Sequence, residues 1–122
     1  MKEIENYEDV SLLVKSFYAK VVENEILAPH FVGLDWEAHF PRMIDFWSFI
    51  LINKEGYKGN VFDKHVHLNI CEPEFDEWLR LFTGTVDEHF IGEKADLAKQ
   101  RASLLKYTFM NKLKELKEKK QD

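Results

Sequence analysis

The spacing of apolar residues along the chain predicts helices almost throughout. In segment 7–24, apolar residues recur at steps of three and one, the period of an amphipathic helix. These residues are Val10, Leu13, Val14, Phe17, Tyr18, Val21 and Val22. Asn6 is placed to cap the helix, and Asp9 lies in its first turn, where the helix dipole favours a negative charge. Pro29 and Gly33 then break the regular pattern.

A second helix is predicted over residues 36–53, and it is apolar on most of its sides, which is typical of a helix buried between partners. Pro41 interrupts this pattern, because a proline inside a helix removes a hydrogen bond and costs about 3 kcal/mol. We therefore expect the regular helix to begin close to Pro41, with residues 36–40 as a lead-in turn. His39 would then lie on a flexible turn, able to point inwards or towards solvent.

The remaining apolar periodicity predicts three more helices, over residues 61–68, 73–91 and 93–118. Pro73 is well placed at a helix start, and Gly92 lies where a C-cap belongs. No segment shows the sustained alternation of a β-strand. The expected fold class is all-α, with four long helices and one short one in a single domain over residues 1–122.

Composition and charge limit the possible partners. The 122 residues are 45% hydrophobic, enough for one core, and the formal net charge is −5. Because no basic stripe is present, we expect no binding to nucleic acid. The longest apolar stretch, FWSFILI, is too short to span a membrane, and the acidic N-terminus does not resemble a signal peptide. Together with a single cysteine, Cys71, these features predict a cytoplasmic protein.

Two neighbouring histidines, His65 and His67, differ in their expected surroundings. Each residue of a helix advances about 100° around the axis, which places His65 on the apolar face with Phe62 and Leu68. His67 lies on the opposite side, near charged residues. An imidazole on an apolar face is either a packed core residue or a ligand to a buried group. Helical geometry therefore selects His65 over His67 but leaves both roles of His65 open.

Several metal and catalytic signatures are absent from the sequence. A dimetal carboxylate site needs a Glu three residues before a His, and none of the five histidines has one. Covalent haem attachment needs two cysteines, and a zinc site built from His65, His67 and Cys71 lacks a fourth ligand. The aromatic content of 14% suits either a core or the walls around a large flat ligand.

Three polar side chains on apolar faces could complete a pocket for non-covalent haem b opposite His65. Tyr18 offers a hydroxyl, Trp78 an indole N–H and His39 a second imidazole. Each of them alone is more typical of an ordinary core or surface position. Their joint occurrence favours a haem pocket, and a cofactor-free helical interaction module is the alternative.

Five stretches in a specific order resemble the truncated haemoglobins of the third group. They are SFYAKV at 16–21, HFPRMIDFWSF at 39–49, YKGNVFDKH at 57–65, FDEWLRLF at 75–82 and QRASLL at 100–105. The resemblance extends from about residue 10 to residue 110. It implies a shortened globin fold, a two-over-two helical sandwich around a haem, with His65 as the proximal iron ligand.

The resemblance also implies a distal side formed by Tyr18, His39 and Trp78. The other implied haem contacts are Phe31, Arg42, Met43, Phe46, Trp47, Lys64, Leu68 and Phe82. Among these, Arg42 and Lys64 are candidates for pairing with the haem propionates. Pro41 departs from the family pattern at the start of the distal helix.

The implied function is binding of O2, NO and CO at a five-coordinate iron. Several hydrogen-bond donors on the distal side would slow O2 release, which suits redox chemistry with O2, peroxide or nitric oxide better than O2 delivery. A peroxidase-like or nitric-oxide dioxygenase activity would also need an electron donor, and a haem or oxygen sensor would need a partner. Because no large exposed apolar patch is expected, we predict a monomer.

The assignment of His65 predicts opposite outcomes for two histidine variants. His65→Ala should abolish or grossly alter axial ligation of the haem. His67→Ala removes the same side chain two residues away and should leave the absorption spectrum nearly unchanged. The visible spectra of both haem-supplied variants test this, and the reverse pair of outcomes would show that the helical-face assignment is wrong.

Overall fold

The computed structural model describes residues 1–55 and 71–120. This part of the chain contains four α-helices, one 3₁₀-helix and no β-strand. The elements are α1 (Tyr7–Val21), η1 (Ala28–Phe31), α2 (Trp36–Ile52), α4 (Glu72–His89) and α5 (Glu93–Lys120). The all-α prediction is therefore confirmed, while the short helix predicted over 61–68 lies outside the described residues.

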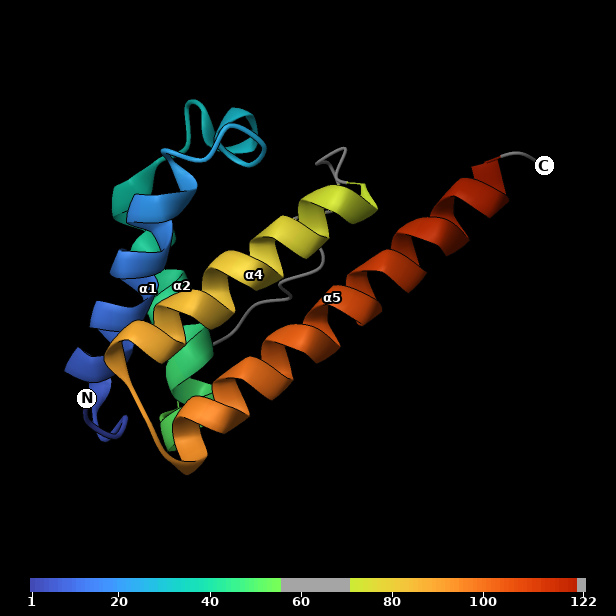
Figure 1. The fold of residues 1–122 in the computed structure, drawn as a ribbon. Helices are drawn as coiled ribbons and strands as arrows, with labels where there is room; N and C mark the ends of the chain where they lie inside the picture. Colours follow the sequence, from blue (N-terminus) through green and yellow to red (C-terminus); the bar gives the residue numbers. More distant parts are fainter. Residues whose placement is uncertain (56–70, 121–122) are drawn as a thin grey trace.

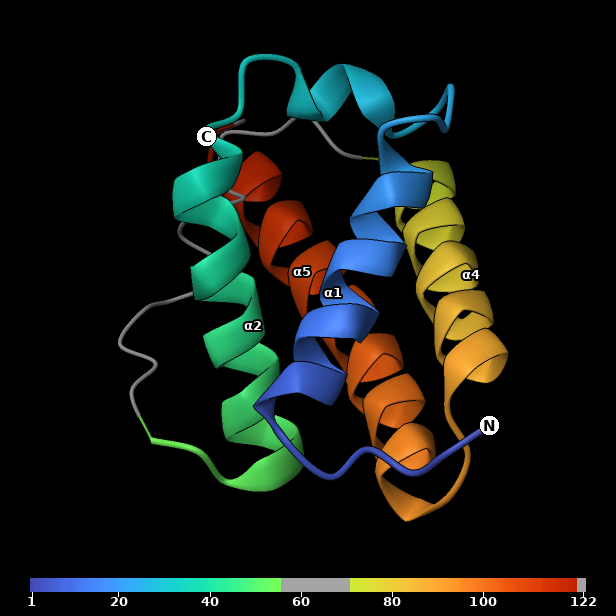
Figure 2. The same ribbon diagram turned by 90° about the vertical axis from the view of Figure 1, so that its left-hand side faces the viewer.

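The four long helices are arranged as two pairs. Helix α1 packs against α2 and also against α4, and α5 packs against α4 and α2. Figures 1 and 2 show α1 beside α2 in one layer and α4 beside α5 in the other. This is the two-over-two arrangement that the family resemblance implied. No helix in the described part is long and apolar enough to cross a membrane.

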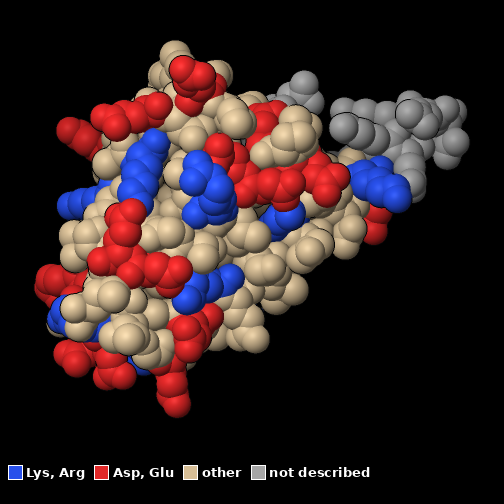
Figure 3. Space-filling view, viewed as in Figure 1, with Lys and Arg blue, Asp and Glu red and all other residues tan. Residues whose placement is uncertain are grey.

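Charged side chains of both signs are mixed over the surface. On the face drawn in Figure 3, Lys and Arg side chains alternate with Asp and Glu side chains, and no continuous basic area is visible. Several of the charges are paired, for example Lys20 with Glu88 at 2.7 Å and Lys99 with Asp87 at 2.8 Å. Exposed pairs of this kind contribute little to stability.

Helix α1 follows its predicted start closely. The side chain of Asn6 accepts a hydrogen bond from the backbone N–H of Asp9 at 2.9 Å, as a capping residue should. The predicted apolar face is buried except for Val22, which caps the C-terminal end and is 48% exposed. The helix ends at Val21, three residues before the predicted end. Its buried face supplies the centre of the core.

The prediction for Pro41 is wrong, because α2 begins five residues earlier and continues through it. Asp35 caps this start: its side chain accepts from Ala38 N–H, and its carbonyl accepts from His39 N–H at 2.9 Å. Pro41 lacks the N–H that would reach the carbonyl of Glu37, and Glu37 is exposed, so water can satisfy that carbonyl. The turn that carries His39 is therefore regular helix.

Gly92 starts α5 rather than capping α4. Helix α4 carries Pro73 in its first turn as predicted, but it ends at His89 with Phe90 as an extended C-cap. The carbonyl of Gly92 instead accepts a hydrogen bond from Asp96 N–H at 3.0 Å. Gly92 has φ of 107°, and an added Cβ would lie 2.7 Å from a carboxylate oxygen of Glu3. The backbone angle is the reason for glycine here, since the Glu3 side chain is exposed and can move aside.

Two glycine variants should therefore change stability in opposite directions. Gly92→Ala should lower the free energy of unfolding by about 1 kcal/mol, since the backbone angle opposes a Cβ. Gly84 lies inside α4 with open space where its Cβ would be, so Gly84→Ala should raise it by about 0.5–1 kcal/mol. Urea unfolding of both variants measures this, and a Gly92→Ala variant as stable as the wild type would contradict it.

Candidate functional site

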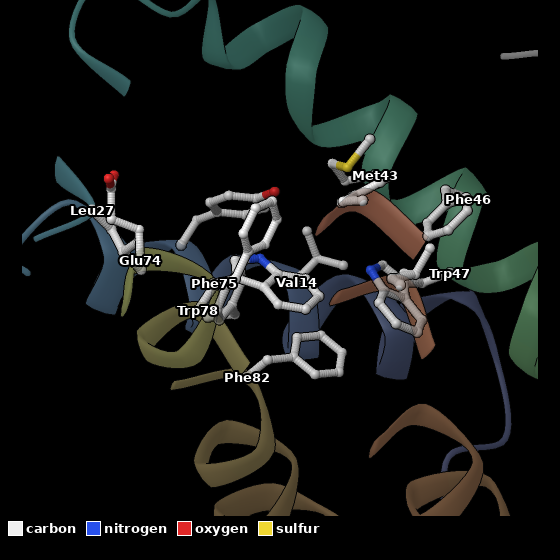
Figure 4. Close-up of a pocket in the computed structure, with 13 residues that line it drawn as sticks. Val14, Leu27, Met43, Phe46, Trp47, Glu74, Phe75, Trp78 and Phe82 are labelled. Carbon is white, nitrogen blue, oxygen red and sulfur yellow. The ribbon is translucent and has the colours of Figure 1, made fainter. Parts of the chain in front are cut away.

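A cavity of about 60 Å³ lies between α1, α2, α4 and α5. It is lined by Val14, Phe17, Tyr18, Leu27, Met43, Phe46, Trp47, Glu74, Phe75, Trp78, Phe82, Leu105 and Phe109. Figure 4 shows how side chains from separate helices converge on it. Among these described residues the polar groups are few: the hydroxyl of Tyr18, the indoles of Trp47 and Trp78, and the carboxylate of Glu74.

Tyr18 lies at the centre of an aromatic cluster and is only 7% exposed. Five rings approach its own ring with centroid distances of 4.8–6.0 Å: Phe17, Phe31, Trp36, His39 and Phe40. Burial raises the pKa of the Tyr18 phenol well above its ordinary value. The hydroxyl therefore stays protonated at physiological pH and can donate a hydrogen bond into the cavity.

Three nearly parallel rings are stacked in a row beside the cavity. Phe82 stacks on Trp47 with a centroid distance of 4.6 Å and on Trp78 with one of 5.7 Å. Phe17 meets Phe82 edge-on at 5.3 Å, which joins the stack to α1. The stack gives the cavity an aromatic lining, which suits an apolar ligand.

His39 faces the interior behind Tyr18. The two ring centroids are 4.8 Å apart with the planes at 80°, and Nε2 of His39 is shielded from solvent. His39 is not among the residues that line the cavity. It packs instead against Tyr18, which does line the cavity. Regular helical backbone on both sides of His39 fixes its position. The structure therefore does not support the prediction that His39 moves between the interior and solvent on a flexible turn.

The structure brings most of the predicted site together and leaves part of it outside its description. Tyr18, Trp78, Met43, Phe46, Trp47 and Phe82 all line the cavity. Phe31 lies one layer out, packed edge-on against the Tyr18 ring, and Arg42 is exposed on α2. Lys64, His65 and Leu68 lie outside the described residues, so the iron ligand stays a prediction.

The sequence did not point to a polar contact between η1 and α4. Nε2 of His30 contacts the carboxylate of Glu74, and both side chains are mostly buried, 20% and 16% exposed. The other carboxylate oxygen accepts from Sγ of Cys71 at 2.9 Å and from Cys71 N–H at 3.3 Å. Cys71 and Glu74 thus form a capping box in which a cysteine replaces the usual Ser or Thr, so the sequence signal was weak.

Glu74 is held as an anion by these contacts. Burial acts to raise its pKa, but the hydrogen bonds from the Cys71 thiol and N–H and from His30 outweigh it, and the net shift is downwards. In turn, the bond to Glu74 raises the pKa of the Cys71 thiol. The thiol is therefore neutral next to an ionised carboxylate.

The chemistry of the lining side chains fits a haem. The macrocycle of a haem supplies four nitrogen ligands to the iron, and the protein needs to add one imidazole. Apolar and aromatic side chains hold the rest of the haem, with one or two hydrogen-bond donors near the bound diatomic ligand. The aromatic lining and the Tyr18 hydroxyl meet those last requirements. The cavity volume is enough for a diatomic ligand. A haem needs more room, and three of its predicted contacts lie outside the described residues.

Comparisons with known proteins agree on one family. Residues 3–113 match the family described as Bacterial-like globin. The chain is 30% identical over 115 residues to Group 3 truncated hemoglobin ctb of Campylobacter jejuni, covering 88% of this chain and 91% of that protein. It also matches the crystal structure of group III truncated hemoglobin from Campylobacter jejuni with a TM-score of 0.82 at 30% identity, covering 93% of this chain and 95% of that one.

Proposed function

Because the chain belongs to the bacterial-like globin family, we propose that it holds one haem b through His65 and binds O2, NO and CO at a five-coordinate iron. The observation that carries this proposal is the buried Tyr18 hydroxyl in an aromatic cavity. When bound, the haem supplies an iron position at which a diatomic ligand acquires partial negative charge. The family favours this over a cofactor-free interaction module.

Tyr18 is the main hydrogen-bond donor in this proposal. Its phenol stays protonated because burial raises its pKa, and its ring is held by neighbours on η1 and α2. A donor that is already oriented loses little freedom when the ligand arrives. In surroundings of low dielectric constant, its bond to a partly negative ligand is stronger than the same bond in water.

Trp78 and His39 support Tyr18 in different ways. Trp78 lines the cavity from α4 and can present its indole N–H as a second donor. His39 packs against the Tyr18 ring and so contributes to the orientation of the hydroxyl. Two donors around one ligand slow its release, which suits redox chemistry with O2, peroxide or nitric oxide better than O2 delivery. That chemistry requires an external electron donor.

Removal of the Tyr18 hydroxyl should accelerate O2 release. Tyr18→Phe keeps the ring and its packing but loses a hydrogen bond worth about 1.5–3 kcal/mol, so the O2 dissociation rate should rise about ten- to a hundredfold. Stopped-flow O2 release from the haem-loaded protein measures this. Tyr107→Phe is the matched control. Tyr107 is exposed on α5, so loss of the same hydroxyl there should leave the O2 dissociation rate unchanged. Unchanged or slower release from Tyr18→Phe would overturn the assignment.

A further inference from the structure

We propose that residues 24–31 form a strap that closes one end of the cavity and opens to admit a ligand. This rests on the proposed haem function and adds a path by which ligands reach the same site. Leu27, in the middle of the strap, lines the cavity together with Glu74 of α4. Figure 4 shows these two residues at one end of the cavity, with Phe46 and Trp47 at the other. Because the Glu74 side chain is 16% exposed, it reaches both the cavity and the surface, so this end lies close to solvent.

Two polar contacts hold the strap against α4, one on each side of Leu27. Nε2 of His30, three residues after Leu27, contacts a carboxylate oxygen of Glu74. The side chain of Asn24, three residues before Leu27, forms a hydrogen bond with Glu77, one turn further along α4. Oδ1 of Asn24 also accepts from Leu27 N–H at 3.0 Å, which orders the strap itself. The strap is therefore attached on both sides of the residue that covers the cavity.

The backbone of the strap forms local hydrogen bonds. Ala28 N–H donates to the carbonyl of Asn24 at 2.8 Å, and His30 N–H donates to that of Leu27 at 3.0 Å. Leu27 is buried, but Ile26 beside it is 45% exposed. A segment held by local hydrogen bonds and a few inward side chains opens more easily than a packed helix. Opening of the strap would move Leu27 away from the cavity without unfolding the long helices, as active-site lids do.

The contact of His30 with Glu74 can be removed without changing the rest of the site. It does not depend on the charge of the imidazole, because a histidine with a proton on Nε2 donates to a carboxylate whether it is neutral or protonated. The other oxygen of Glu74 serves the capping box with Cys71, so a change at Glu74 would also disturb the start of α4. A change at His30 leaves that capping box in place.

His30→Leu should open the strap more often. Loss of a partly exposed hydrogen bond should raise the equilibrium constant for opening about twofold to tenfold. Hydrogen exchange of the strap amides, followed by mass spectrometry in the full chain, should quicken by that factor. CO association with the ferrous, haem-loaded protein should quicken in parallel. Because one path serves entry and exit alike, CO dissociation should rise by the same factor, and CO affinity should change less than about twofold.

Two variants serve as controls at the same pH and ionic strength. His30→Gln keeps a hydrogen-bond donor for Glu74 and should restore the exchange and CO rates of the wild type. His89→Leu makes the same replacement at the last residue of α4, outside the described cavity lining, and should leave both kinds of rate unchanged.

Several results would overturn the proposal. CO association could be unchanged in His30→Leu, with or without faster exchange of the strap, which would place ligand entry elsewhere. A rise in CO dissociation alone would mean that His30 acts on the bound ligand. Equal effects in His30→Gln would assign the change to packing, and equal effects in His89→Leu would make it general to the fold.

A second variant covers the case in which His30→Leu does not take up haem. His30→Phe also removes the donor but keeps a ring, and the same changes in exchange and CO rates are expected. Failure of both variants to take up haem would make His30 a folding residue and overturn the proposal. Failure of the wild type to take up haem would instead overturn the haem function on which the strap's role in ligand entry rests.

Discussion

The burial of two consecutive aromatic residues on α1 is the constraint on which the rest of the structure depends. Phe17 packs against Trp78 and Phe82 on α4, while Tyr18 packs against η1 and the start of α2. Side chains at neighbouring positions of a helix diverge by about 100°, so one turn of α1 contacts both layers of the fold. Tyr18 also lines the cavity, so its hydroxyl is available as a donor to a ligand there.

Polar groups in the cavity are few, and each has a separable role. The Tyr18 hydroxyl and the Trp78 indole can donate to a ligand, whereas the Glu74 carboxylate can only accept or repel. Donors favour a ligand that gains negative charge after it binds. This agrees with the globin family to which the chain belongs.

Sequence periodicity was sufficient for the four long helices and for the inward-facing aromatic residues, because burial of an apolar stripe decides both. The errors lie at single positions where local and tertiary effects compete. Pro41 is tolerated because it falls in the second turn of α2, next to an exposed carbonyl, and Asp35 caps the helix before it. The pairing of His30 with Glu74 joins residues 44 positions apart, and no local pattern could reveal it.

The central claim is that the chain binds a haem beside Trp47 and Trp78, and titration of the haem-free protein with haemin tests it most directly. Both indoles line the cavity, so a haem bound there should quench tryptophan fluorescence by energy transfer. The account predicts that quenching and the Soret absorbance reach their end points together, at one haemin per chain. Fluorescence that stays unquenched while a Soret band develops would show that the haemin is not bound to the chain, and the absence of both signals would likewise contradict haem binding.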